Sequence, residues 1–92
     1  MTFAVTALNF TNAKALLKEG LDAVAQGECE YDLGALTQVD SASVAVIVAW
    51  QRAAVKMGKK ISFINAPSGL INLADLYGVT ALLNFVKRAD VA

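Results

Sequence analysis

Glycines and a single proline divide this 92-residue chain into short segments, and the apolar pattern changes in kind from one segment to the next. Short alternating or compact apolar patterns predict strands at residues 2–10, 28–33, 61–65 and 79–86. Apolar residues at three- and four-residue spacing, or nearly continuous ones, predict helices at residues 11–25, 43–57 and 68–77. Strands that alternate with helices indicate right-handed βαβ units with parallel pairing.

The chain is therefore predicted to be one domain over residues 1–92, of the α/β class. We expect a small sandwich in which a mixed, mostly parallel β-sheet carries helices packed on it. The hydrophobic content is 57% and the charged content only 17%. A chain this short and this apolar cannot hide all of its apolar surface, so we expect a protein partner to cover part of it.

Charge and cysteine content narrow the classes of function. Eight basic and eight acidic residues give a formal net charge of zero, which argues against nucleic acid as a partner. The longest apolar run, residues 44–50, is far short of the ~20 residues that span a bilayer. Residues 1–10 lack the pattern of a signal peptide. Cys29 is the only cysteine, so we predict a buried thiol and a reducing compartment.

Asp40 and Ser41 lie between a predicted loop and a predicted helix, near the carboxyl edge of the sheet, where open α/β sheets place functional groups. Either side chain can cap the helix, and phosphate on Ser41 would meet the free N–H groups of the first turn. Catalysis is not favoured, because the chain has no histidine and no G-x-x-x-x-G-K-[ST] loop. We expect no enzymatic activity, no cofactor and no metal site.

The helix predicted at residues 43–57 has two apolar stripes. Val44, Ile47 and Val55 belong to one stripe, and Trp50 and Met57 belong to the other. One stripe must face the sheet, and the other must lie under a neighbouring element or meet a partner. Trp50 is a candidate anchor for a partner, since tryptophan is frequent in interface hot spots, and core packing is the alternative.

Two stretches resemble the STAS domain family. They are "YDLGALTQVDSASVAVIVAW" from Tyr31 and "GKKISFINAPSGLINLADLYGV" from Gly58. Asp32-Leu33 matches the end of a family strand, and Asp40-Ser41 matches the Asp-Ser-x-Gly motif at the head of the family's long helix. Within the family, "LADLYGV" at residues 73–79 and the neutral, alanine-rich helix are most similar to the small STAS subunit of Mla-type phospholipid-transport ABC systems.

The resemblance implies a function without chemistry. It implies a cytoplasmic subunit, peripheral to the inner membrane through the transporter complex, that binds the ABC transporter ATPase and supports its assembly and activity. The alternative that the resemblance leaves open is an anti-sigma-factor antagonist in which phosphorylation of Ser41, the position equivalent to the family phosphosite, releases the partner.

The predicted partner-binding residues lie on the motif helix and on the helix that follows. They are Asp40, Ser41, Ser43, Ile47, Trp50, Ser68, Leu70, Leu76 and Tyr77. Ser43 replaces the family glycine, which would alter the approach of a partner backbone. The opening hairpin of the family is shortened here, and an open sheet edge would allow a homodimer.

Overall fold

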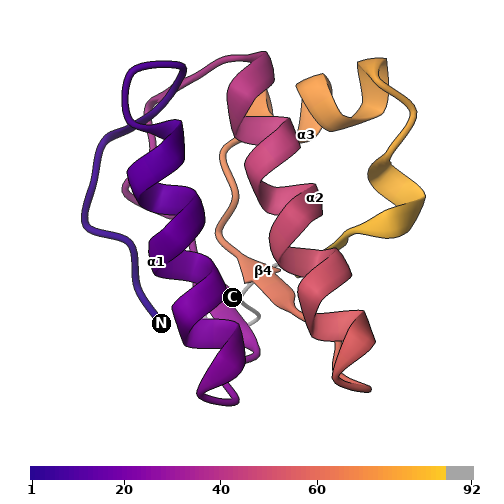
Figure 1. Ribbon diagram of the computed structural model, residues 1–92. Helices are drawn as coiled ribbons and strands as arrows, with labels where there is room; N and C mark the ends of the chain where they lie inside the picture. Colours follow the sequence, from indigo (N-terminus) through magenta and orange to yellow (C-terminus); the bar gives the residue numbers. More distant parts are fainter. Residues whose placement is uncertain (87–92) are drawn as a thin grey trace, which may run out of the picture.

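The computed structural model describes residues 1–86, which form a layer of short strands and three α-helices (Figure 1). The strands are β1 (Ala7–Leu8), β2 (Glu30–Asp32), β3 (Gln38–Val39), β4 (Ser62–Ile64) and β5 (Asn84–Val86). The helices are α1 (Ala13–Ala25), α2 (Ser41–Lys56) and α3 (Ser68–Leu76), followed by a 3₁₀ turn, η1 (Thr80–Leu82). The predicted α/β class is confirmed.

The strands form two small sheets. One has the order β2-β4-β5, with Tyr31 opposite Phe63 and Phe63 opposite Phe85, and the other pairs β1 with β3. Every strand pair within residues 1–86 is parallel. This pairing follows from the chain order, because each parallel neighbour is reached through a helical crossover.

The predicted strand at residues 2–10 is split into two pieces. Thr2 bridges to Asp32 beside β2, whereas β1 pairs with β3 after a bend at Thr6. Phe3 and Leu8 are both buried, yet they are five residues apart. A continuous strand would point odd-spaced residues to opposite faces, so the chain bends to bring both side chains into the core.

Helices α1 and α2 lie side by side in front of the strands, and α3 packs against α2 (Figure 1). Each helix ends in a glycine with positive φ, namely Gly27, Gly58 and Gly78. At the end of α2, the Gly58 N–H donates to the carbonyl of Val55 and the Lys59 N–H donates to that of Ala54, at 2.9 Å each. This pattern satisfies the last carbonyls, and it ends α2 at the glycine that directly follows the helix predicted at residues 43–57.

Trp50 lies at the centre of the core. Its ring stacks on Phe3 with centroids 4.9 Å apart and meets Tyr31 at 5.4 Å. The indole Nε1–H donates to the Leu17 carbonyl oxygen at 3.0 Å, so the polar atom of the ring is satisfied. The absence of a side chain at Gly20 makes room for this ring, because a Cβ there would lie 2.1 Å from Trp50 Cε2.

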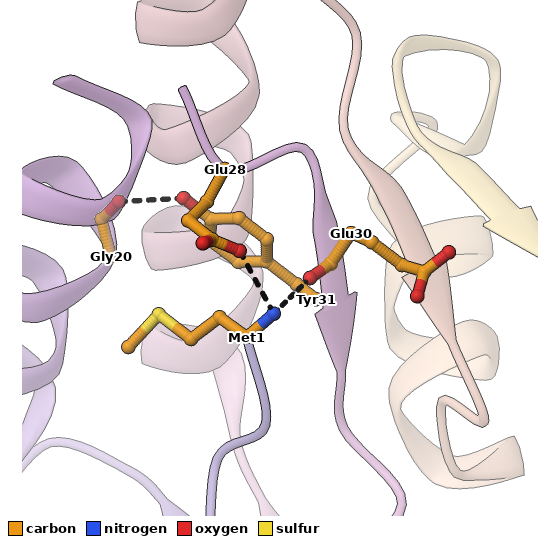
Figure 2. A network of polar contacts seen from close by, with 5 residues as sticks. All are labelled: Met1, Gly20, Glu28, Glu30 and Tyr31. Carbon is orange, nitrogen blue, oxygen red and sulfur yellow. Dashed lines mark hydrogen bonds and ion pairs between the residues drawn. The ribbon is translucent and has the colours of Figure 1, made fainter. Parts of the chain in front are cut away.

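The β2 side of the core is closed by the polar contacts in Figure 2. The Tyr31 hydroxyl donates to the Gly20 carbonyl oxygen at 2.7 Å. Burial raises the pKa of Tyr31 to about 12, and the negative charges of Glu28 and the Cys29 thiolate add to the shift. The Met1 ammonium donates to Glu28 Oε1 at 3.2 Å and to the Glu30 carbonyl oxygen at 2.6 Å.

Cys29 is exposed, so the prediction of a buried thiol is wrong. Two residues further along the predicted strand, Tyr31 is buried, and so is Leu33, as side chains on the same face of a strand should be. Cys29 directly precedes β2, and its carbonyl oxygen accepts from the Ser62 N–H of β4 at 2.8 Å while its side chain faces solvent.

Candidate functional site

Asp40 joins two segments at the amino end of α2. Its Oδ1 accepts from the Ala42 N–H at 2.9 Å, which confirms the predicted cap. Its Oδ2 accepts from the Phe10 N–H at 3.2 Å. One carboxylate therefore caps the helix and holds the turn that precedes α1.

Ser41 and Ser43 have different environments although they are two residues apart. Ser41 is the first residue of α2 and is exposed. Ser43 is buried, and its hydroxyl donates to the Asp40 carbonyl oxygen. In the isolated domain the Ser43 hydroxyl is turned inward and used within the first turn, so it is not on the accessible surface of α2.

Three other predicted contact residues are also buried, namely Ile47, Trp50 and Leu70. In the isolated domain these side chains face the interior. Helix α2 lies between α1 and α3, so Ile47 and Trp50 on its two apolar stripes have neighbours within the domain. Leu70 lies on α3, which itself packs against α2. Only Val55 and Met57, at the carboxyl end of these stripes, are exposed.

Phe10 is a surface residue that sequence reasoning missed. Its side chain is 88% exposed, although the turn that carries it is tightly held. Asn9 Oδ1 accepts from the Thr11 N–H, and Asn12 Oδ1 accepts from the Asn9 N–H, at 2.9 Å each. Asn12 Nδ2 also donates to the Ala7 carbonyl oxygen at 2.8 Å. The sequence did contain a signal for an exposed turn here, because Phe10 lies between Asn9 and Asn12 and asparagine favours turns. The signal was overlooked because Phe10 was assigned to the strand predicted at residues 2–10.

An apolar groove of about 450 Å³ runs between α1 and α2 beside Phe10. Its walls include Ala13 and Leu17 of α1 and Ala42 and Ala45 of α2, with Ser41 at its edge. The small side chains of α2 are what leave this surface hollow.

A second groove of about 320 Å³ lies on the other side of Ser41 and Ala45, toward the end of α3. Tyr77 lines this groove and is 52% exposed, and its neighbour Leu76 is 76% exposed. We call the five residues Phe10, Ser41, Ala45, Leu76 and Tyr77 the docking surface. Of the predicted contact residues, Ser41 lines both grooves and Tyr77 lines the second, and the exposed Leu76 is adjacent to Tyr77 in the chain.

Ser68 lies at the same edge of the fold but outside both grooves. It is exposed and begins α3, and a Cβ on the next residue, Gly69, would lie 3.7 Å from Val39 Cγ2 at the end of β3. Ser68 is therefore close to the Asp40 turn without lining the docking surface.

Asp32 and Asn65 form a polar pair that ties the ends of β2 and β4. Asn65 has a φ of 58° and places its Nδ2 3.4 Å from each carboxylate oxygen of Asp32. The Gly34 N–H donates to Asp32 Oδ1 at 2.9 Å. Asparagine tolerates left-handed backbone, so Asn65 can adopt this turn and still bond to Asp32. The pair therefore has a structural role, holding the ends of β2 and β4 together.

These features find a counterpart among known proteins. A family model described as "Mlab, STAS domain" matches residues 4–84. The chain belongs to the STAS-domain family. A putative anti-sigma factor antagonist from Thermotoga maritima has the same fold as this STAS domain, with a TM-score of 0.80 at 17% identity, over 98% of this chain and 80% of that one. The comparison with curated proteins gives no match.

No helix within residues 1–86 is long and apolar enough to cross a membrane. The same residues contain no group of three or more cysteine or acidic side chains placed to hold a metal ion.

Proposed function

We propose that this STAS domain is a non-catalytic docking subunit that binds the ATPase of a phospholipid-transport ABC transporter. The description of the matching family model and the "LADLYGV" stretch support this choice of partner. Under this proposal the protein is cytoplasmic and is held near the inner membrane by the transporter. Its contact with the ATPase involves Asp40 and the docking surface, with Ser68 at the margin.

The bare phenyl ring of Phe10 is the observation that carries the proposal. Ordering an exposed aromatic side chain above an apolar groove has no benefit for the isolated domain, because the ring remains in water. In a complex, a preorganised turn reduces the entropy lost on binding, and a buried aromatic ring contributes strongly to affinity. The small side chains of Ser41 and Ala45 would then admit a convex apolar element of the partner.

Co-purification with the ATPase tests this surface. Phe10→Ser and Ala45→Glu are each expected to weaken ATPase capture by at least about tenfold, since hot-spot losses commonly exceed 1.4 kcal/mol. Val55→Ser and Ala25→Glu are the matched controls, because they change an exposed apolar residue and an exposed helical alanine outside the docking surface. If Phe10→Ser and Ala45→Glu are both folded and still capture the ATPase, the interface lies elsewhere.

The second candidate function is that of an anti-sigma-factor antagonist regulated by phosphorylation of Ser41. The exposed position of Ser41 at the start of α2, between the two grooves, favours it. A phosphate there would be stabilised by the helix N-terminus and would place negative charge in an apolar contact. Phosphate on Ser41, lost in Ser41→Ala but retained in Ser68→Ala, together with an anti-sigma kinase gene nearby, would favour this function over transport.

Self-association is a further part of the proposal. The predicted homodimer needs an open sheet edge. The edge beside β2 is covered by residues 1–3, because the Asp32 N–H donates to the Met1 carbonyl oxygen and the Phe3 N–H donates to that of Asp32. A homodimer would have to use another edge. Sedimentation of the full chain as a monomer at high concentration would exclude it.

A further inference from the structure

A basic patch lies at the carboxyl end of α2, opposite the docking surface. Half of the eight basic residues of the chain are found between residues 52 and 60. No acidic residue is present between residues 41 and 74. The patch consists of Arg52, Val55, Lys56, Met57, Lys59 and Lys60, all of which are exposed.

The end of α2 brings these side chains together. Arg52, Val55 and Lys56 are three and four residues apart, which places them on one face of the helix. Lys59 lies against the last turn of α2, because its N–H donates to the Ala54 carbonyl oxygen after the chain turns at Gly58. A Cβ on Gly27 would lie 3.0 Å from Lys59 Nζ, so this ammonium lies beside the end of α1.

The positive charges of the patch are not neutralised within the described part of the chain. The ion pairs among residues 1–86 are Met1 with Glu28 and Lys18 with Asp22. Neither uses a residue of the patch. Glu28, which lies next to Gly27, is already engaged by the Met1 ammonium. The patch therefore combines four available cations with two exposed apolar side chains.

We propose that the basic patch rests on an anionic lipid surface. Basic side chains near such a surface gain electrostatic attraction, and interspersed apolar side chains gain from insertion at the headgroup boundary. Val55 and Met57, 60% and 48% exposed, supply that apolar component.

The composition and shape of the patch favour lipid over two other anionic partners. Single-stranded nucleic acid is bound with aromatic side chains on which bases stack, and the patch contains none. An acidic peptide would be expected in a groove, and the grooves beside Phe10 and Tyr77 include no residue of the patch. A purely structural explanation is that basic residues stabilise the negative end of the α2 dipole. That effect is limited to the last turn, which contains Lys56, and it does not explain two exposed apolar residues among the lysines.

Lipid contact is independent of the docking proposal. Sixteen residues of helix separate Asp40 from Met57, which corresponds to about 24 Å. Figure 1 shows the two ends of α2 at opposite ends of the molecule. A partner on the docking surface would leave the basic patch free, and failure of either proposal leaves the other standing.

Vesicle cosedimentation of the full chain tests the inference. At about 0.1 M salt, where charges more than about 10 Å apart are largely screened, we expect binding to vesicles of equal parts phosphatidylglycerol and phosphatidylcholine but not to phosphatidylcholine alone. Lys59→Glu with Lys60→Glu should weaken binding by more than about tenfold, because each basic charge contributes roughly fivefold. Val55→Ser with Met57→Ser should remove the part of the binding that resists higher salt.

Lys14→Glu with Lys18→Glu is the matched control, since it reverses two exposed lysines on α1 and changes the net charge equally. It should alter vesicle binding by less than about twofold in folded protein. Equal weakening by both double variants, or no binding to the anionic vesicles, would overturn the inference. So would binding of poly-glutamate or a single-stranded DNA oligomer by a chain that leaves the vesicles unbound.

Discussion

Gly20 illustrates how a single residue sets the position of the core. Helix propensity alone predicts that Gly20→Ala stabilises α1 by about 0.5–1 kcal/mol. The structure predicts the opposite, because the new methyl group would lie within 2.7 Å of three atoms of the Trp50 indole. The ring cannot retreat easily, since Phe3 stacks on it and the Leu17 carbonyl oxygen accepts its N–H.

We expect Gly20→Ala to lower the free energy of unfolding by about 2 kcal/mol or more, as overpacked cores do. Urea denaturation measures this change. Gly69→Ala in the first turn of α3 is the control, because a methyl group there would have only an ordinary contact with Val39, and it should be neutral or slightly stabilising. Similar stability of the two variants would contradict the packing described for Trp50.

The burial of some predicted contact residues could not be read from the sequence for a similar reason. Trp50 and Ile47 belong to apolar stripes that a lone helix would expose. Whether such a stripe meets a partner or another helix of the same domain depends on the positions of α1 and α3, which periodicity does not encode.

At the scale of elements, α2 begins with a residue that also holds another segment. Asp40→Ala is expected to lower the free energy of unfolding by about 1–2 kcal/mol, since the Ala42 N–H and the Phe10 N–H both lose their acceptor. Asp40→Ser should retain most of that stability, because serine caps helices well. A serine side chain that caps the helix would leave the Phe10 N–H without its acceptor.

Hydrogen exchange separates the two roles. In Asp40→Ser, the Phe10 amide should exchange faster while the amides in the interior of α2 keep their protection. Unchanged exchange at Phe10 would show that the Asn9 and Asn12 bonds alone hold the turn. If the docking proposal is right, Asp40→Ser should also weaken ATPase capture without loss of fold.

Helix ends were more predictable than strand lengths. Gly58 and Gly78 mark the ends of α2 and α3 because a C-terminal αL residue is a local requirement that glycine meets most readily. The predicted final strand at residues 79–86 instead begins as η1 and becomes β5 at Asn84. A strand exists only where a neighbour supplies hydrogen bonds, and β5 has Ser62–Ile64 of β4 as that neighbour.

For the whole molecule, we expect one cooperative unfolding transition. The ring of Trp50 contacts Phe3 near the amino end and Tyr31 of β2. Its Nε1–H also donates a hydrogen bond to the Leu17 carbonyl oxygen of α1. The two small sheets therefore share one core, and neither has enough buried surface to persist alone. Fluorescence of the single tryptophan and far-UV circular dichroism should follow the same urea curve. Separate midpoints would contradict the prediction of one domain over residues 1–92.

The sequence by itself determined the features that depend on near neighbours along the chain. These are the alternation of strands and helices, the Asp40 cap, the glycine helix ends and the motif of the STAS family. Local hydrogen bonds and side-chain periodicity act over a few residues, so a pattern can reveal them.

Only the tertiary structure decided which apolar surface remains exposed. It buried Ser43, Ile47, Trp50 and Leu70, and it left Phe10 in the open beside a groove. Burial depends on which elements meet across the fold, as when Gly20 of α1 receives a ring from α2. The physical reason is that exposure is a property of the packed assembly, whereas the sequence lists only the surfaces available for packing.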